Sequence, residues 1–290
     1  MGDGIEMKQN NVNLGLGGGH LIQVANRSLT QMMSYVIDTP EGNVIVIDGG
    51  NYCKEDADCL YELLRNRGNR VDLWLITHAH GDHFGALLWL WENCPDFNVV
   101  IHKLVYNFPT LEWLSATEKN NNTHRFLNAV EKQGIYVYIP QAGEIISCGG
   151  INLEIVSVPE QYEKYPTINS TSIITVVHFP KRDVLFLGDF DIHGQEEFLR
   201  KHSSNSIRKD IVQMAHHGQG GVDFNFYKLI QPKICLYTAP QWLWENNKYE
   251  CTDPSSAGTG PFTTLETRRW MEELGVEQSF THAEGDYIFF

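Results

Sequence analysis

Short apolar runs alternate with turn residues in the first quarter of the chain. Three of these runs predict strands, at 20–25, 34–38 and 44–48. A turn at 40–43 joins the last two as a hairpin. Residues 55–67 begin with acidic side chains and carry apolar residues at helical spacing, which predicts a helix. The mostly apolar run at 71–76 then predicts a buried strand.

The pattern in the rest of the chain is again a mixture of helices and strands. A helix is expected at 84–93, and the helical pattern at 110–133 is interrupted by three asparagines at 120–122, so it indicates two helices or one helix with a loop. Further strands are expected at 151–158, 171–179, 184–187, 211–215, 234–238 and 287–290. Further helices are expected at 193–202, 223–230 and 263–274, with a polar loop before Gly260.

This order gives two β-rich halves, each followed by helices. Such a pattern is typical of two sheets packed face to face with helices outside, an α+β fold in four αββα layers. No linker and no repeat of fixed period interrupts the chain, so residues 1–290 are expected to form a single domain.

Composition narrows the function classes. The 290 residues are 42% hydrophobic and 20% charged, which is ordinary for a globular protein. The formal net charge of −14 repels polyanions and disfavours nucleic acid as a partner. The N-terminal stretch lacks the pattern of a signal peptide and no run reaches membrane-spanning length, so a cytoplasmic protein with no membrane contact is expected. The six cysteines form no CxxC pair and are expected to be reduced thiols.

Ligand-type side chains gather directly after the strand at 71–76. The sequence THAHGDHFG at 77–85 places three histidines and an aspartate in six consecutive positions. His78 and His80 are two residues apart at a strand end and can share a face, while Asp82 and His83 follow a tight glycine turn and can serve a second cation. This mixture of nitrogen and carboxylate ligands suits Zn²⁺, with Mn²⁺ or Fe as alternatives.

Similar side chains end two later strands. The strand at 184–187 is followed by Asp189, and the strand at 211–215 is followed by His216 and His217. Taken singly, Asp189 is explained as a helix cap and the paired histidines as turn residues. Together, three strands that deliver ligands to one sheet edge indicate a metal site, in which Asp189 is placed to bridge two cations.

The order of four motifs resembles the metallo-β-lactamase-fold hydrolase superfamily over most of the chain. These motifs are IDGG at 47–50, THAHGDH at 77–83, LGD at 187–189 and AHHG at 215–218. The stretch NSTSII at 169–174 and the closing stretch at 281–288 are similar to the branch that includes the β-lactamase-like domain of the competence DNA-uptake channel and the choline-phosphate esterases. The resemblance implies an αββα sandwich with a two-metal centre in a cleft at one sheet edge.

The resemblance also implies a role for each motif residue. The first metal would be held by His78 and His80, the second by Asp82 and His83, and Asp189 would bridge them. Either His216 or His217 would complete the second site, and His216 is favoured because it is the first residue past the strand. The remaining assignments are Asp48 as a brace that hydrogen-bonds ligands, Asn169 as a further candidate, and Asp82 as the residue that accepts or returns a proton in catalysis.

The sequence departs from the family pattern at two places. Val158-Pro159-Glu160-Gln161 stands where many members have a histidine turn, which leaves the first metal short of a protein ligand. The segment at 247–254 lacks the histidine of the competence-type motif, which argues against a nuclease-like activity.

The expected function is hydrolysis by a hydroxide that two divalent metal ions activate. A phosphoester or phosphodiester in a small molecule is the favoured substrate, because the resembling branch is rich in phosphoesterases. Two alternatives remain, a hydrolase of a carbonyl substrate such as a lactone, thioester or β-lactam, and a non-catalytic metal-binding module. A flavin-partnered oxygen reductase is disfavoured because the chain has no flavin domain. The substrate, the native metal and the oligomeric state are left open.

Overall fold

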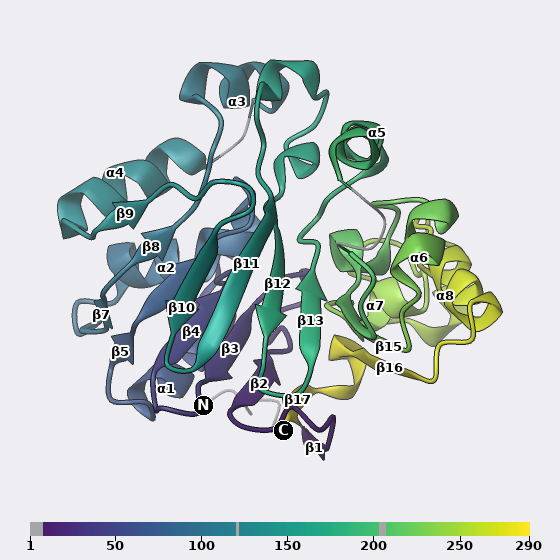
Figure 1. Ribbon diagram of the computed structural model, residues 1–290, viewed down its shortest axis with the longest axis horizontal. Helices are drawn as coiled ribbons and strands as arrows, with labels where there is room; N and C mark the ends of the chain where they lie inside the picture. The colour runs from purple at the N-terminus through teal and green to yellow at the C-terminus, as the bar shows by residue number, and fades with distance from the viewer. Residues whose placement is uncertain (1–7, 120–121, 203–206) are drawn as a thin grey trace.

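The computed structural model describes residues 8–119, 122–202 and 207–290. In this part of the chain two large sheets lie face to face, and helices cover both outer surfaces (Figure 1). The first sheet has the order β1 (Gln9–Val12), β17 (Asp286–Phe289), β2 (His20–Gln23), β3 (Tyr35–Asp38), β4 (Val44–Ile47), β6 (Leu73–Leu75), β8 (Leu104–Val105) and β9 (Val137–Tyr138). The second has the order β10 (Ile145–Cys148), β11 (Ile151–Ser157), β12 (Ile174–His178), β13 (Asp183–Phe186), β14 (Ile211–Gln213), β15 (Ile234–Tyr237) and β16 (Gln278–Thr281).

The core lies between the two sheets and holds side chains from alternate positions of their strands. Tyr35 of β3 and Phe186 of β13 meet edge to face across this core, with ring centroids 5.0 Å apart. β14 and β15 are parallel strands covered on both faces, which is why their sequences are mostly apolar.

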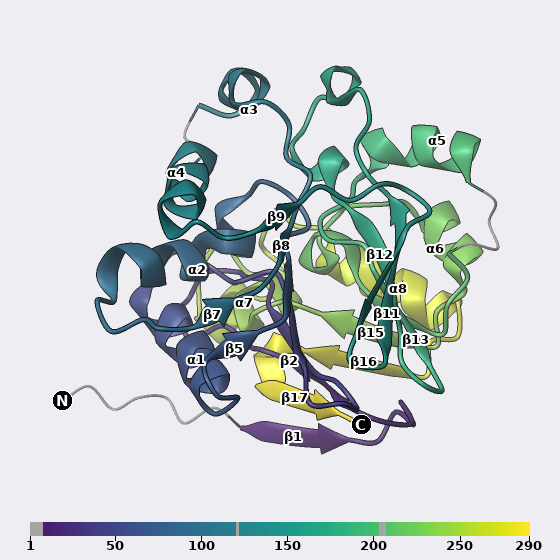
Figure 2. The ribbon, with the colours of Figure 1, turned by 60° about the vertical axis from the view of Figure 1, so that its left-hand side comes forward.

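Two sets of helices bury the outer faces. The first sheet is covered by α1 (Lys54–Arg65), α2 (Gly81–Asn93) and α4 (Thr123–Gln133). The second is covered by α5 (Ile192–Lys201), α6 (Phe224–Ile230), α7 (Gln241–Trp244) and α8 (Thr264–Glu273). The fold is therefore the expected αββα sandwich, and Figure 2 shows the two sheets and their helices from the side. No helix among the described residues is long and apolar enough to cross a membrane.

Several short elements differ from the sequence prediction. The strand expected at 71–76 is divided at Asp72 into β5 (Arg70–Val71), which pairs with β7 (Val100–Ile101), and β6. The Asp72 carboxylate accepts a hydrogen bond from Val44 N at 2.9 Å. The pattern at 110–133 forms two helices, α3 (Leu111–Thr117) and α4; of the three asparagines between them, residues 120–121 lie outside the described residues. The polar loop before Gly260 contains α7.

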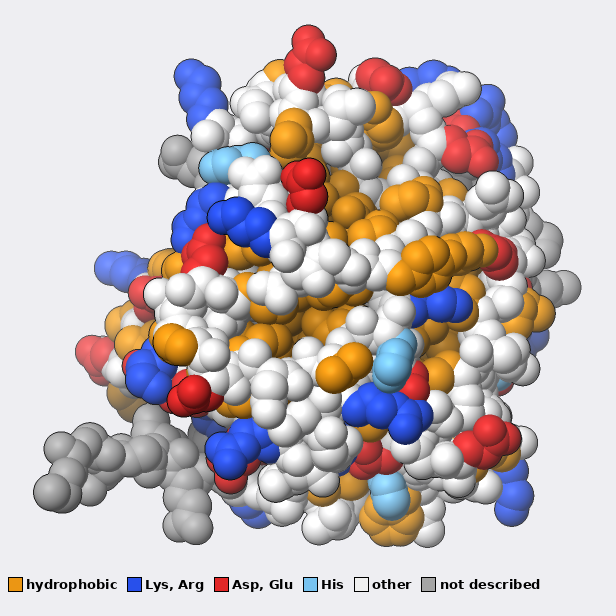
Figure 3. Space-filling model, turned by 90° about the vertical axis from the view of Figure 1, so that its left-hand side faces the viewer, with side chains coloured by type: hydrophobic (Ala, Val, Ile, Leu, Met, Phe, Trp, Pro, Cys, Tyr) orange, Lys and Arg blue, Asp and Glu red, His pale blue; other side chains and the backbone are white. Residues whose placement is uncertain are grey.

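The parallel strands bring the ligand-type side chains to one edge of the sandwich. β4 and β6 run parallel in the first sheet, and β13, β14 and β15 run parallel in the second. The carboxyl ends of parallel strands meet at the same edge, so the residues that follow these strands gather there. A different side of the molecule, which carries the edge strands β9 and β10, shows a band of exposed apolar side chains (Figure 3).

Candidate metal centre

The loop after β6 places two histidines with their ring nitrogens together. His78 Nε2 lies 3.0 Å from His80 Nδ1. On its other side, His78 Nδ1 lies 3.1 Å from Thr77 Oγ1, and that hydroxyl donates its own hydrogen to Asp48 Oδ2 at 2.8 Å. Thr77 Oγ1 therefore accepts from His78 Nδ1, which leaves the Nε2 lone pair of His78 directed at His80.

The first turn of α2 supplies Asp82 and His83. His83 is fully buried, and its Nδ1 lies 2.8 Å from Asp48 Oδ2. Because Asp48 also accepts hydrogen bonds from Thr77 N and Thr77 Oγ1, its carboxylate acts as an acceptor and His83 carries its proton on Nδ1. The other ring nitrogen of His83, Nε2, faces the carboxylates of Asp82 and Asp189, at 3.8 and 3.3 Å.

Asp189 lies between the histidines of the two sheets. It follows Gly188, whose φ of +57° and close approach to Thr77 disfavour any residue with a side chain. Asp189 N donates to Ser172 Oγ at 3.1 Å. Its Oδ2 lies 3.9 Å from His78 Nε2 and 3.5 Å from His217 Nε2. The carboxylate is buried, so it needs positive charge on both sides.

The two histidines after β14 have different surroundings, although both have positive φ angles. His217 is fully buried and its Nδ1 lies 3.2 Å from the carbonyl oxygen of Thr238, which only accepts, so Nδ1 carries a proton. Its Nε2 lies 3.1 Å from Asp82 Oδ2. His216 is partly exposed, with Nε2 3.4 Å from Asn169 Nδ2 and 3.9 Å from Asp189 Oδ2.

Two groups of ligand atoms are thus close enough to hold metal ions. The first group consists of His78, His80 and Asp189, and the second of Asp82, His83, Asp189 and His217. Asp189 belongs to both. The buried atoms His83 Nε2 and Asp189 Oδ1 have no hydrogen-bond partner within the described residues, which is the state expected of atoms that a cation would satisfy. The donor set therefore fits divalent metal ions.

Without a cation the group depends on protons for charge balance. Burial raises the cost of the charge on Asp82, but the neighbouring His83 and the hydrogen bond from His217 hold the pKa of Asp82 below its usual range. Burial favours a neutral His217, but Asp189 and Asp82 raise the pKa of His217 to about 9. Burial, together with His83, lowers the pKa of His78 well below its ordinary value. Carboxylates and imidazoles therefore compensate one another in this site.

A comparison of the whole sequence with protein families agrees with this geometry. The model of the metallo-beta-lactamase superfamily matches residues 29–223, more than half of the chain. The chain belongs to the metallo-beta-lactamase superfamily. The superfamily consists mostly of metal-dependent hydrolases, and its members bind divalent metals, often two. No curated protein matches the sequence.

Solved structures share the fold at low sequence identity. The metallo-beta-lactamase fold protein YhfI from Bacillus subtilis is 11% identical, with a TM-score of 0.51 over 93% of this chain and 99% of YhfI. CmlA, a diiron beta-hydroxylase from Streptomyces venezuelae, is 12% identical, with a TM-score of 0.54 over 93% of this chain. The match covers 54% of CmlA, so this chain spans about half the length of that protein. At these identities the likeness concerns the fold.

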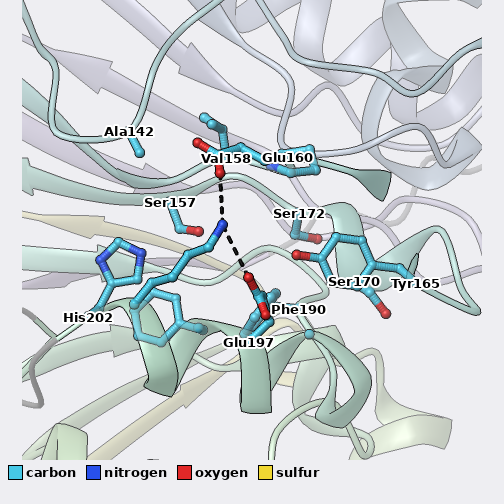
Figure 4. Close-up of a pocket in the computed structure, with 14 residues that line it drawn as sticks. Ala142, Ser157, Val158, Glu160, Tyr165, Ser170, Ser172, Phe190, Glu197 and His202 are labelled. Atoms are coloured by element: carbon cyan, nitrogen blue, oxygen red, sulfur yellow. Dashed lines mark hydrogen bonds and ion pairs between the residues drawn. The ribbon is translucent and has the colours of Figure 1, made fainter. Parts of the chain in front are cut away.

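Most residues expected as metal ligands lie together, but His216 belongs to neither group of ligand atoms. The second group of ligand atoms includes His217 in place of His216, which the sequence analysis favoured, because His217 turns inward from the end of β14. Glu160, in the turn where many superfamily members have a histidine, pairs with Lys201 at 2.7 Å, and Lys201 also contacts Glu197. Figure 4 shows these ion pairs at a small pocket of about 80 Å³, so the Glu160 carboxylate is engaged by a lysine.

Sequence reasoning missed two contacts of the site. Glu118 Oε2 lies 2.9 Å from His80 Nε2, although the two residues are 38 positions apart. No sequence pattern marks Glu118. It lies just after α3, and the sequence predicted only an interrupted helical region there, without the ends of each helix. Thr238, which holds His217, does carry a signal, since it ends a parallel strand at the same sheet edge as Asp189.

Proposed function

We propose that this protein is a hydrolase that uses two divalent metal ions. The first ion would be held by His78, His80 and Asp189, and the second by Asp82, His83, His217 and Asp189. The observation that carries the proposal is the arrangement of the buried histidines His78, His83 and His217. In each ring Nδ1 contacts a hydrogen-bond acceptor, and Nε2 faces the carboxylates of the site. Such outer partners orient the ligands of metal sites.

Bound divalent ions would polarise a substrate oxygen and lower the pKa of water toward neutrality. The chain supplies the remaining functions. Asp189 is enclosed, with 2% of its side chain exposed, and is suited to hold ions. Asp82 is more open, at 19%, and its Oδ2 also lies 3.4 Å from Gln31 Nε2. We assign Asp82 the additional role of accepting a proton from water or returning one to the leaving group.

The favoured substrate is a small phosphoester or phosphodiester. A pocket of about 610 Å³ has room for a small molecule, and two of its walls include residues that lie close in sequence to contacts of the site. One wall includes Thr30, next to Gln31, and the other includes Pro240, which follows closely on Thr238. The similarity of the stretch at 169–174 to a phosphoesterase-rich branch supports the phosphorus substrate. Zinc is the proposed metal because the donor set suits it, and iron is the alternative because CmlA is a diiron protein.

The proposal is tested by metal content and turnover on the same protein. Zinc and iron are measured per chain after purification without added metal. Hydrolysis of bis(p-nitrophenyl) phosphate is then followed before and after chelation, in the wild type, in His80→Ala and in the control His102→Ala, which changes an exposed histidine. We expect two ions per chain and turnover that is lost on chelation and in His80→Ala, but kept in the control.

Other outcomes would redirect the proposal. Two ions without phosphodiester turnover would contradict the phosphorus substrate and point to a lactone, thioester or β-lactam, since the same chemistry attacks carbonyl carbon. Fewer than one ion per chain, with no turnover after reconstitution, would overturn the hydrolase proposal in favour of a non-catalytic module.

A further inference from the structure

A separate segment of the chain covers the first group of metal-binding residues. This segment, here called the α3 cap, consists of residues 110–118 and includes α3. Thr110 caps the helix by accepting a hydrogen bond from Trp113 N, and Glu118 ends it, with Glu118 N bonded to Leu114 O at 2.9 Å. α3 lies above the edge of the sandwich, next to α4 (Figure 2).

Apolar contacts fix the α3 cap on the metal-binding loop. Leu114 is buried in a small cluster with Ala79, the residue between His78 and His80, and with Ile168. Trp113 packs edge to face against Tyr162, with ring centroids 5.8 Å apart. These contacts hold the end of α3 over His80, so Glu118 is placed by the fold of the cap.

Glu118 decides which nitrogen of His80 carries the proton. Its Oε2 lies 2.9 Å from His80 Nε2, and a carboxylate accepts, so the proton is on Nε2. The Nδ1 lone pair of His80 then faces the Nε2 lone pair of His78 at 3.0 Å. Two lone pairs at this distance repel unless a cation lies near both, so the hydrogen bond of Glu118 prepares a cation site.

His80 differs from the other histidines of the site in the origin of its partner. Asp48 and Thr238, which hold His83 and His217, are buried residues at the ends of core strands. Glu118 is half-exposed and comes from the cap. The first group also has fewer protein ligands, since Glu160 is directed to Lys201. The first site therefore depends more strongly on the orientation of His80 than the second depends on any one ring.

We propose that Glu118 is a positioning residue for the first metal ion, and that docking of the α3 cap sets the affinity of that site. This inference rests on the proposed two-metal function. The carboxylate selects the ligating tautomer of His80, as outer carboxylates do in other metal sites. The second site, held by Asp48 and Thr238, is independent of the cap.

The first test follows metal binding. Metal-free protein is titrated with Zn²⁺ in competition with a chromophoric chelator, for the wild type and for Glu118→Ala, Glu118→Gln and the control Glu112→Ala, which changes an exposed acid on the same helix. We expect Glu118→Ala to weaken one of two sites by about 10-fold to 100-fold, toward the lower end because Glu118 is half-exposed. The Zn²⁺ affinity of Glu118→Gln should lie between those of the wild type and Glu118→Ala, because the amide oxygen still accepts a hydrogen bond but carries no charge.

The second test needs no metal. Nitrogen NMR of the metal-free protein at mildly alkaline pH reports which ring nitrogen of His80 carries hydrogen. We expect Nε2–H in the wild type and a shift toward Nδ1–H in Glu118→Ala, which a merely structural role of Glu118 would not produce.

The outcomes separate this inference from the proposed function. Two wild-type sites with unchanged affinities in Glu118→Ala, or an unchanged His80 tautomer, would overturn the role of Glu118 and leave the hydrolase proposal intact. A wild-type protein that binds no ion would overturn both. Loss of both sites in Glu118→Ala would contradict the independence of the second site.

Discussion

At the scale of single residues, three positions of the candidate metal centre have a strained backbone. Asp48, His216 and His217 have φ angles between 50° and 59°, a region that side-chain-bearing residues seldom adopt. Such conformations cost on the order of 1–3 kcal/mol each and persist where surrounding contacts enforce them. The three hydrogen bonds to the Asp48 carboxylate and the contacts of His217 with Thr238 are those contacts.

Replacement of Asp48 by asparagine tests this brace without disturbing its backbone, because asparagine tolerates positive φ. Asparagine has one acceptor oxygen, so it loses part of its hold on Thr77 and His83. We expect Asp48→Asn to fold and to bind metal about 10-fold to 100-fold more weakly, measured by chelator competition. Asp58→Asn, which changes an exposed carboxylate on α1, should bind normally. An unchanged metal affinity in Asp48→Asn would show that Asp48 does not support the metal ligands.

The buried side chain of His282 leads to a prediction about how stability depends on pH. It is buried, neither ring nitrogen has a hydrogen-bond partner among the described residues, and burial lowers its pKa well below 6.5. Below pH 6.5 the unfolded chain takes up a proton that the folded chain does not, so stability falls as pH falls, by up to about 1.4 kcal/mol per pH unit. In His282→Phe this part of the acid sensitivity should disappear.

The measurement is urea unfolding of both proteins at several pH values between neutrality and pH 5. The other titrating groups are common to both proteins and cancel in the difference. Parallel stability curves for wild type and His282→Phe would contradict the depressed pKa of His282.

The sequence predicts the site residues that stand in one motif or at strand ends. His78, His80, Asp82 and His83 lie within six consecutive positions, so a single local pattern brings them together. The choice between His216 and His217 depends on the backbone angles of one turn, which no hydrophobic pattern encodes. The contact of Glu118 with His80 depends on where α3 docks, which is a property of tertiary packing.

At the scale of secondary-structure elements, α2 must lie very close to the segment that follows Asp48. Ala86 N donates to Gly50 O at 3.2 Å, and His83 O accepts from Gly49 N. A β-carbon at Gly85 would lie 2.3 Å from Tyr52 N. This close approach sets the position of His83, so the glycine in α2 is a requirement of the site as well as of the fold.

Two glycines of α2 give a matched pair of substitutions. In Gly85→Ala the new methyl group meets backbone, so we expect a loss of about 1–3 kcal/mol in the free energy of unfolding. Gly81 also lies in α2, but a β-carbon there meets nothing within 4 Å, so Gly81→Ala should be neutral or stabilise by up to about 1 kcal/mol. Urea denaturation measures both. Equal effects would mean that α2 and the 49–52 segment are less tightly packed than described.

The length of each element determines how well the hydrophobic pattern predicted it. Long runs such as β11 and helices such as α1 have a clear period, so their positions were predicted to within a few residues. β8 and β9 have two residues each, too few to show a period. β1 is a polar strand that is held by parallel pairing with β17 at the other end of the chain, a contact that local sequence does not report.

At the scale of the whole molecule, the candidate metal centre joins the two halves of the sandwich. Asp82 and His83 belong to α2, which covers the first sheet, whereas Asp189 and His217 follow strands of the second. The ring of His83 and the carboxylate of Asp189 are buried and face each other across this junction. A cation bound to both would therefore tie one half to the other. The expectation that residues 1–290 form a single domain stays a prediction. A cation at this junction would be one physical link between the two halves.

Metal binding should then stabilise the entire fold. A ligand that binds only the folded state at 100 times its dissociation constant contributes about 2.7 kcal/mol per site, so thermal unfolding should occur at a higher temperature with Zn²⁺ than with chelator. In Asp189→Asn the shared ligand is weakened, and the metal-dependent rise in melting temperature should shrink for both sites together. Calorimetry with and without metal measures this. If the rise in Asp189→Asn equals that in the wild type, Asp189 does not link the two sites, and the two halves are held together by the apolar core between the sheets alone.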